Sequence, residues 1–275
     1  MDSLANATVV LTGATSGIGE ALAVMLSGCV RRLIVHGPEP EEQVLSVLSR
    51  LRERSSCEVR YVSADFANLD EVSAFGDDIA RSERAITLLI NNAGVPGLPE
   101  RTMTVDEHER TLQVNCYAQA LLTAKLLPAI TRDARIVNVG SGTHHYESLH
   151  FDDLTFDESY EAAAAYYRSK LAMVTYSMWL ANHLRRSGVN VVTACPGVND
   201  TALIKSMFGE MGSPVEVGAA YLLDATIGEY ATGTYTHEGA IETPSAEATD
   251  AAVQEELIHA IESAIGLSLT AVRNR

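Results

Sequence analysis

The sequence is short of positive charge and of long hydrophobic segments. Its 275 residues include 20 Lys and Arg against 36 Asp and Glu, a formal net charge of -16. So acidic a chain argues against binding nucleic acid or an anionic membrane through a basic surface. No run of about 18 apolar residues occurs, so we expect no membrane-spanning helix.

The four cysteines form no recognisable pattern. Cys29, Cys57, Cys116 and Cys195 are widely spaced, and none belongs to a CxxC or Cys/His ligand motif. Neither a disulfide framework nor a metal site is therefore predicted. The N-terminal stretch MDSLANATVVLTG has no basic segment ahead of its apolar residues, so we expect no secretory leader. These absences favour a protein of the reducing cytoplasm.

The sequence does contain a sustained alternation of two patterns. Apolar segments rich in β-branched residues predict buried strands at 8–13, 32–37, 58–65, 86–94, 135–141 and 189–197. Helical periodicity appears between them, at 19–28, 41–54, 69–83, 106–130 and 162–188. Such alternation indicates a parallel sheet covered on both faces. We predict one doubly wound α/β domain over 1–275, with a last strand near 233–239 and a terminal helix.

A glycine-rich turn, TGATSGIGEAL, follows the first predicted strand and opens a helix. Gly13, Gly17 and Gly19 let the backbone turn tightly and approach a pyrophosphate, to which the helix N-terminus offers free N–H groups. A strand-to-helix turn that binds no ligand also uses glycine. The spacing is GxxxGxG and not the general GxGxxG, so by itself the turn leaves both interpretations open.

Tyr166 and Lys170 stand four residues apart in AYYRSKLAMV, within a helical pattern. Side chains four apart share one face of a helix, so the phenol and the ammonium lie close together. A neighbouring ammonium lowers the pKa of a phenol by favouring phenolate, which suits a general acid. An ordinary core tyrosine is the other interpretation, and Tyr167 competes with Tyr166 for the role.

These motifs together resemble the short-chain dehydrogenase/reductase family. TGATSGIG is similar to the family's glycine signature, NNAG at 91–94 closes the fourth predicted strand, and YxxxK follows in family order. The stretch GSGTHHYESLHFDDL resembles the retinol-dehydrogenase-like branch. The resemblance covers nearly the whole chain and implies a Rossmann-type fold that binds NAD(H) or NADP(H).

The resemblance implies a catalytic tetrad of Asn115, Ser141, Tyr166 and Lys170. Tyr166 would give its proton to a carbonyl oxygen as hydride is transferred, and Ser141 would orient that carbonyl and hold the developing oxyanion. Lys170 would tune the phenol and hydrogen-bond the nicotinamide ribose. Asn115 would kink its helix and hold a water.

The resemblance also implies the cofactor contacts. They are Gly13, Thr15, Ser16, Gly17, Ile18, Gly19, Gly37, Asp65, Phe66, Asn92, Ala93, Gly94, Tyr166, Lys170, Pro196, Gly197, Val198 and Thr201. Gly37 holds the place where NAD users of the family carry an acid, and neither Pro38 nor Ser16 supplies the base of NADP users. Acidic residues follow at Glu39, Glu41 and Glu42. We expect weak discrimination with a slight lean to NAD(H).

The segment 202–214 lies where the family carries a variable substrate lid. Its apolar side chains suit a hydrophobic pocket or a core at helical spacing equally well. They are Leu203, Ile204, Met207, Phe208 and Met211. His144 and His145 are interpreted as loop histidines near the substrate entrance, because adjacent histidines do not easily face one metal ion.

Three functions fit these residues. The first is an NAD(P)(H)-dependent oxidoreductase that interconverts a carbonyl and an alcohol on a small to medium hydrophobic metabolite. The second keeps the cofactor but performs dehydration, isomerisation or cyclisation, and the third is a non-catalytic NAD(P)-binding regulator. We expect a small-molecule substrate, no nucleic-acid or membrane partner, and a homo-oligomer (dimer or tetramer) formed through the helices beginning near Asp106 and Ala162.

Overall fold

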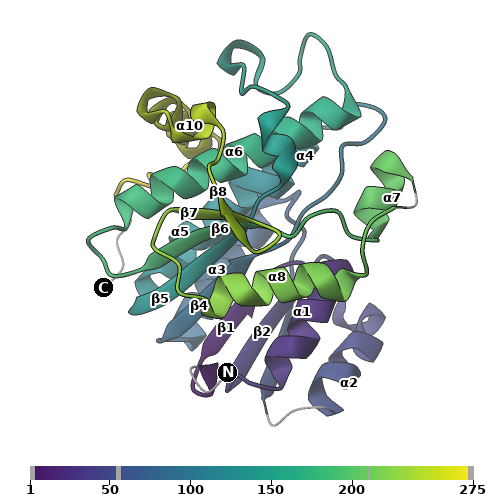
Figure 1. Ribbon diagram of the computed structural model, residues 1–275, viewed down its shortest axis with the longest axis vertical. Coiled ribbons are helices and arrows are strands. Elements are labelled where there is room, and N and C mark those ends of the chain that lie inside the picture. The colour runs from purple at the N-terminus through teal and green to yellow at the C-terminus, as the bar shows by residue number, and fades with distance from the viewer. Residues whose placement is uncertain (1–3, 54–56, 210, 272–275) are drawn as a thin grey trace.

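The computed structural model describes residues 4–53, 57–209 and 211–271. The predicted domain over 1–275, the predicted lid over 202–214 and the predicted helix over 41–54 each include residues outside these ranges. The described residues form one sheet in the order β3-β2-β1-β4-β5-β6-β7-β8 (Figure 1). The order reverses beside β1, which is the arrangement of a doubly wound fold.

The strands lie where the apolar segments predict them. The parallel strands are β1 (Thr8–Leu11), β2 (Arg32–Gly37), β3 (Glu58–Ser63), β4 (Ile86–Asn91), β5 (Ile130–Val139), β6 (Asn190–Cys195) and β7 (Thr234–His237). The sequence did not predict β8 (Ala240–Glu242), which pairs antiparallel with β7. Its three residues are all exposed, so it lacks the alternation that marks a half-buried strand.

Helices cover both faces of the sheet. One face carries α1 (Gly17–Ser27), α2 (Leu45–Glu53) and α8 (Val215–Ile227), and the other carries α3 (Leu69–Ser82), α5 (Ala118–Leu126) and α6 (Ala162–His183). Shorter elements include α4 (Arg110–Leu112), α7 (Ala202–Phe208) and α9 (Ala246–Thr249), with 3-10 turns at Glu41–Gln43, Leu127–Ala129, Gly142–His145 and Phe151–Asp153. Among the described residues, no helix combines the length and apolarity needed to span a membrane.

The helix predicted over 106–130 is interrupted at Asn115. Between α4 and α5 the chain forms a π-helical turn, Gln113–Tyr117. There the side chain of Gln119 donates to the backbone oxygen of Asn115 at 3.2 Å. The Asn115 side chain forms two bonds with the backbone of Val95, accepting from its N–H at 2.8 Å and donating to its oxygen at 3.0 Å. The expected kink is confirmed, since such turns form where side chains disturb the regular ladder.

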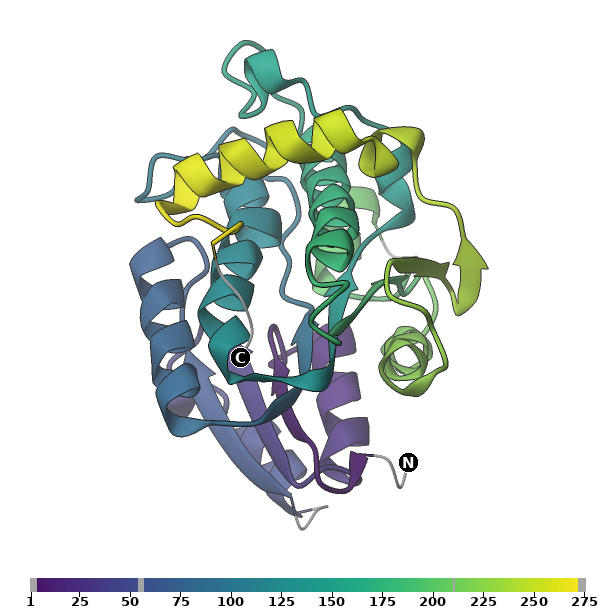
Figure 2. The ribbon, with the colours of Figure 1, turned by 90° about the vertical axis from the view of Figure 1, so that its left-hand side faces the viewer.

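The C-terminal helix α10 (Ala251–Ile265) packs across α6 and α5 (Figure 2). Its Leu257, Ile258 and Ile261 are buried in the same apolar cluster as the outer face of α6. Trp179 of α6 packs against that cluster as well. The helix α10 thus covers part of the surface of α6 and α5 through which the sequence predicted a second copy to bind.

Candidate active site

A cavity of about 810 Å³ opens at the carboxyl ends of the parallel strands. Its position beside β1, where the strand order reverses, is the usual ligand crevice of an open α/β sheet. Every predicted cofactor residue lines it except Gly19 and Gly37. Of the predicted catalytic residues, Ser141, Tyr166 and Lys170 line the cavity, whereas Asn115 lies behind it.

The glycine turn after β1 is packed too tightly for side chains. Gly13 has φ +64°, and a Cβ there would lie 2.7 Å from the Ala93 Cα. A Cβ on Gly19 would lie 1.9 Å from the Gly13 oxygen, so this glycine serves helix packing and not contact with the cavity. Ser16 starts α1 without a side-chain cap, which leaves the helix N-terminus facing the cavity. The turn therefore fits a pyrophosphate.

Asn92 fixes the glycine turn to the end of β4. Its Nδ2 donates to the backbone oxygens of Thr12 at 2.9 Å and Gly13 at 3.0 Å. In return, the Thr12 hydroxyl oxygen accepts from the backbone N–H groups of Asn92 and Ala93, both at 3.0 Å. Asn91, one residue earlier, is buried and donates to Thr123 and Asn138 in the core. The NNAG stretch thus braces the strand ends against each other.

His36, at the end of β2, also lines the cavity and is buried. Its Nδ1 accepts from the Gly13 N–H at 3.2 Å, and its Nε2 lies 2.9 Å from the Ala64 oxygen, so Nε2 carries the proton. The ring stacks on Phe66 with centroids 4.3 Å apart. Burial lowers the pKa of His36 to about 4. A neutral imidazole therefore joins the ends of three strands.

Tyr166 and Ser141 meet at the inner end of the cavity. The Ser141 oxygen accepts from the Thr143 backbone N–H at 3.2 Å and from the Thr143 hydroxyl at 2.9 Å. With both lone pairs engaged, Ser141 interacts with the Tyr166 oxygen through its own hydrogen. A hydrogen bond between Ser141 and Tyr166 lowers the phenol pKa, although burial raises it by more. Tyr167 does not line the cavity, so Tyr166 is the one of these two adjacent tyrosines that the fold presents to the cavity.

The sequence led us to expect that Lys170 lowers the pKa of Tyr166, but in the fold this pKa is raised. The Lys170 Nζ lies 5.7 Å from the centroid of the Tyr166 ring and donates to the Val139 oxygen at 3.2 Å. Both side chains are buried, and loss of hydration disfavours the charged form of each. Burial therefore raises the pKa of Tyr166 and lowers that of Lys170 to about 8. The phenol is held in its protonated form.

Asn115 supports Lys170 from behind. A Cβ on Gly94 would lie 3.4 Å from Asn115 Oδ1 and 3.5 Å from Lys170 Nζ, so glycine leaves space for both groups. Asn115 Nδ2 donates to the Ser169 hydroxyl at 2.9 Å, which ties the π-helical turn to the residue before the lysine. The four predicted catalytic residues are thus brought to one place, three in the cavity and one behind it.

The segment around α7 borders the outer part of the cavity. Leu203, Ile204 and Phe208 line it, whereas Met207 does not. No residue of α7 is buried, so the interpretation of these side chains as core is wrong. Met211 is 48% exposed and does not line the cavity.

The histidine pair of the sequence divides into two different environments. His145 is exposed, but His144 is fully buried and does not line the cavity. The expectation of two entrance histidines is therefore wrong for His144, because its ring turns inward to backbone partners.

Several residues of the cavity wall were missed from the sequence, among them His36, Glu39, Tyr146 and His237. His36 had a detectable signal, a polar residue inside the apolar stretch RLIVHG. Glu39 was singled out only as one of three nearby acids, either repelling a 2'-phosphate or starting the next helix, and not as part of the cavity wall. Tyr146 and His237 come from a loop and from a strand far along the chain, where no local pattern marks them.

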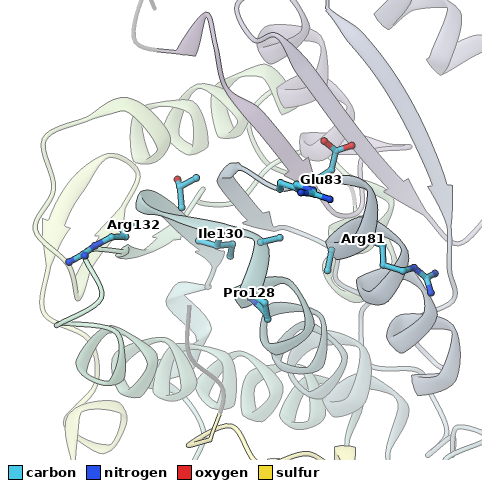
Figure 3. A pocket seen from close by; sticks show the side chains of 9 residues that line it. Arg81, Glu83, Pro128, Ile130 and Arg132 are labelled. Carbon is cyan, nitrogen blue, oxygen red and sulfur yellow. The ribbon is translucent and has the colours of Figure 1, made fainter. Parts of the chain in front are cut away.

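A second hollow, of about 580 Å³, lies between the end of α3 and the start of β5 (Figure 3). Its rim includes Arg81, Arg84 and Arg132, together with Glu83. Figure 3 shows Arg81 and Arg132 pointing away from each other. The hollow therefore lacks a converging set of polar groups, unlike the cavity at the strand ends.

Comparisons with known proteins agree with this geometry. A profile of the short chain dehydrogenase family matches residues 7–211. Polyprenol dehydrogenase of Mus musculus is 37% identical over a region covering 71% of this chain and 61% of that protein. Retinol dehydrogenase 14 of Homo sapiens is 31% identical over 94% of this chain and 86% of that protein. The chain thus spans about 61% of the mouse relative's length.

Solved structures have the same fold. An uncharacterized protein from Mycobacterium paratuberculosis aligns with a TM-score of 0.81 and 25% identity, covering 96% of this chain and 95% of that one. A short chain dehydrogenase from Burkholderia cenocepacia, solved in complex with NADP, aligns with a TM-score of 0.70 and 20% identity, covering 86% and 97%.

Proposed function

Because the chain belongs to the short-chain dehydrogenase family, we propose that it is an NAD(P)(H)-dependent oxidoreductase that interconverts a carbonyl and an alcohol. The observation that carries the proposal is the meeting of Ser141 and Tyr166 at the inner end of a cavity whose outer part has a phosphate-type glycine turn. Neither feature alone implies redox chemistry, but together they support a proton donor beside a cofactor site.

The residues of the glycine turn and the strand ends would hold the cofactor. Gly13, Ser16 and Gly17 would receive the pyrophosphate, and Asp65 and Phe66 would border the adenine. When bound, the nicotinamide supplies or accepts the hydride. We propose that Lys170 holds the adjoining ribose, since its Nζ reaches the cavity and, among the described residues, donates to the Val139 oxygen alone.

Tyr166 is the general acid for reduction. Its phenol is protonated at neutral pH and would donate to the substrate oxygen, and in the reverse direction it would take up the alcohol proton. Ser141 would turn its hydrogen from the Tyr166 oxygen to the same substrate oxygen, because its lone pairs are already engaged by Thr143. Lys170 has a pKa lowered to about 8, which suits a group that returns a proton to Tyr166.

The substrate side of the cavity suits an apolar molecule of small to medium size. Leu203, Ile204 and Phe208 from α7 form one wall, and Tyr146 lies at the mouth with 73% of its surface exposed. We propose that the segment 202–214 closes over the substrate as a short lid, and that the domain over 1–275 needs no second domain to complete the site. The absence of buried residues in α7 supports this role, since nothing anchors the helix in the core.

We further propose that the protein works in the cytoplasm, without a nucleic-acid or membrane partner. All four cysteines are unpaired thiols, which is the expected state in a reducing compartment. The net charge of -16 supports the absence of polyanionic partners.

A non-redox reaction on the same site is the alternative, because an acid at Tyr166 also serves dehydration or isomerisation. The test is absorbance at the reduced-nicotinamide band with a panel of aldehydes, ketones and alcohols of increasing hydrophobic length. Substrate-dependent change in that band supports the oxidoreductase. Product formation without it would overturn the redox proposal, and tight cofactor binding with no product would favour a regulator.

A further inference from the structure

His144 lies directly behind the turn that carries Ser141. Its ring is 0% exposed. The Nδ1 atom is 2.6 Å from the Ser141 backbone oxygen, and Nε2 is 3.1 Å from the Ser245 backbone nitrogen. A backbone oxygen can only accept and a backbone N–H can only donate, so Nδ1 carries the proton and Nε2 is the acceptor. One neutral tautomer satisfies both bonds.

The partner on the far side belongs to the C-terminal part of the chain. Ser245 begins α9, where its hydroxyl accepts from the Ala248 N–H at 3.3 Å. A second bond joins the same two segments in the opposite direction, since the Leu149 N–H of the loop donates to Glu247 Oε1 at 2.8 Å. These α9 residues lie beyond 211, where the match to the family profile ends. Two bonds therefore attach the loop after Ser141 to a segment outside the family's matched region.

The Ser141 hydroxyl depends on this backbone. Its oxygen caps the turn Gly142–His145 by accepting from Thr143. The direction in which the Ser141 hydroxyl can donate therefore depends on the position of the Ser141 backbone. The hydrogen bond from His144 holds that backbone in place. Hydrogen bonds to a developing oxyanion act through accurate placement, and small displacements of the donor are costly.

We propose that His144 is a positioning residue for Ser141: its imidazole bridges the Ser141 oxygen to the Ser245 N–H, so that α9 sets the orientation of the catalytic hydroxyl. The inference rests on the proposed function. Packing alone is the competing role, since the ring also contacts Tyr235, with centroids 5.0 Å apart. The two roles can be separated, because a replacement that still donates a hydrogen bond should restore kcat only if His144 acts by positioning Ser141.

The first test compares His144→Leu, His144→Asn and the control His145→Leu. Leucine fills space without hydrogen bonds, whereas the asparagine amide can donate to the Ser141 oxygen. We expect His144→Leu to lower kcat about 10- to 100-fold, with the cofactor Kd within about twofold of the wild type. His144→Asn should recover at least about a third of the wild-type kcat. His145 is exposed, but its ring lies 3.9 Å from that of His144 between centroids, so His145→Leu alters a packing contact of His144 while keeping both hydrogen bonds. It should change kcat little.

The second test leaves His144 in place. Ser245 has φ -56°, which proline adopts without strain, so Ser245→Pro removes the N–H donor. Ser245→Ala keeps that N–H and removes only the hydroxyl cap. The proposal expects kcat to fall about 10-fold in the proline variant relative to the alanine variant.

Either of two results would overturn the inference. One is a kcat for His144→Leu above about half that of the wild type; the other is equal kcat in the two Ser245 variants. Failure of the proposed function is separate, because the wild type would then show no nicotinamide turnover at all. In that case nitrogen NMR of the His144 ring and amide exchange of Ser245 still report on the bridge. An Nε2-protonated ring would refute it.

Discussion

The hydroxyl of Thr15 donates to Glu39 Oε2 at 3.0 Å, joining the glycine turn after β1 to the turn after β2. Both residues line the cavity, and the Tyr61 hydroxyl fixes the Glu39 backbone oxygen at 2.6 Å. A Cβ on Gly37 would lie 2.6 Å from the same carboxylate oxygen. An acid therefore stands close to the place that we propose for the adenine ribose, although Gly37 itself carries none.

We expect this carboxylate to disfavour a 2'-phosphate, so the wild type should use NAD(H) better than NADP(H). Glu39→Gln should reduce that preference, and Pro38→Arg should move it toward NADPH. A charge-assisted hydrogen bond contributes roughly 1.5 to 3 kcal/mol, so each shift should be about 10- to 100-fold in the ratio of kcat/KM values. Glu42→Gln is the control, because Glu42 is exposed and outside the cavity wall. A wild-type preference for NADPH in kcat/KM would refute the prediction.

Tyr166→Phe should remove the general acid while keeping the ring volume. We expect cofactor binding to persist and kcat to fall by about 10² to 10⁴. Tyr167→Phe, one position along α6, should be mild because Tyr167 does not line the cavity. Steady-state turnover and cofactor titration separate the effects. Retention of more than about a tenth of the activity in Tyr166→Phe would contradict the assignment.

Acid should destabilise the fold through His36. Its folded-state pKa, about 4, lies below its ordinary value of 6.5, so the unfolded chain takes up the proton more readily. The contribution of neutral His36 to the free energy of unfolding is complete above about pH 6.5 and is lost as the pH falls toward 4. The total loss is at most roughly 3 kcal/mol. Urea midpoints between pH 7.5 and 4.5 should fall, and less steeply in His36→Gln. Some slope should remain, because burial also lowers the pKa of His144 to about 4. Equal slopes in wild type and variant would exclude this role for His36.

The cover supplied by α10 leads us to expect a monomer where the sequence suggested a dimer or tetramer. Leu257 is fully buried between α10 and its neighbours. Leu257→Asp should displace the helix, lower the free energy of unfolding by about 3 kcal/mol or more, and promote association at micromolar concentration. Light scattering measures the mass of both proteins. A wild-type dimer that Leu257→Asp leaves intact would show that association uses another surface.

Sequence patterns predicted the sheet and most of the site because both depend on local signals. Strands such as β2 are marked by apolar β-branched residues, and the cofactor turn by its glycines. Tyr166 and Lys170 were identifiable because helical spacing alone puts them on one face. The position of Asn115 in a kinked helix came from resemblance and not from periodicity.

The role of His144 could not be predicted in this way. It lies in a polar loop with no hydrophobic period, and its partner Ser245 is 101 residues away along the chain. The direction of the shift in the Tyr166 pKa was predicted wrongly for a related reason. Spacing places Lys170 nearby, but only the three-dimensional packing shows that loss of hydration raises the pKa of Tyr166 and that the opposing effect comes from the Ser141 hydrogen bond.

The position of α10 has a consequence for synthesis on the ribosome. Chains emerge from their N-terminus, so α6 is complete before residues 251–265 exist to cover it. During that interval the side of α6 that includes Trp179 faces solvent, as does the matching side of α5. The nascent protein therefore passes through a stage at which α6 exposes an apolar surface to solvent. We expect chaperones to bind the protein at this stage.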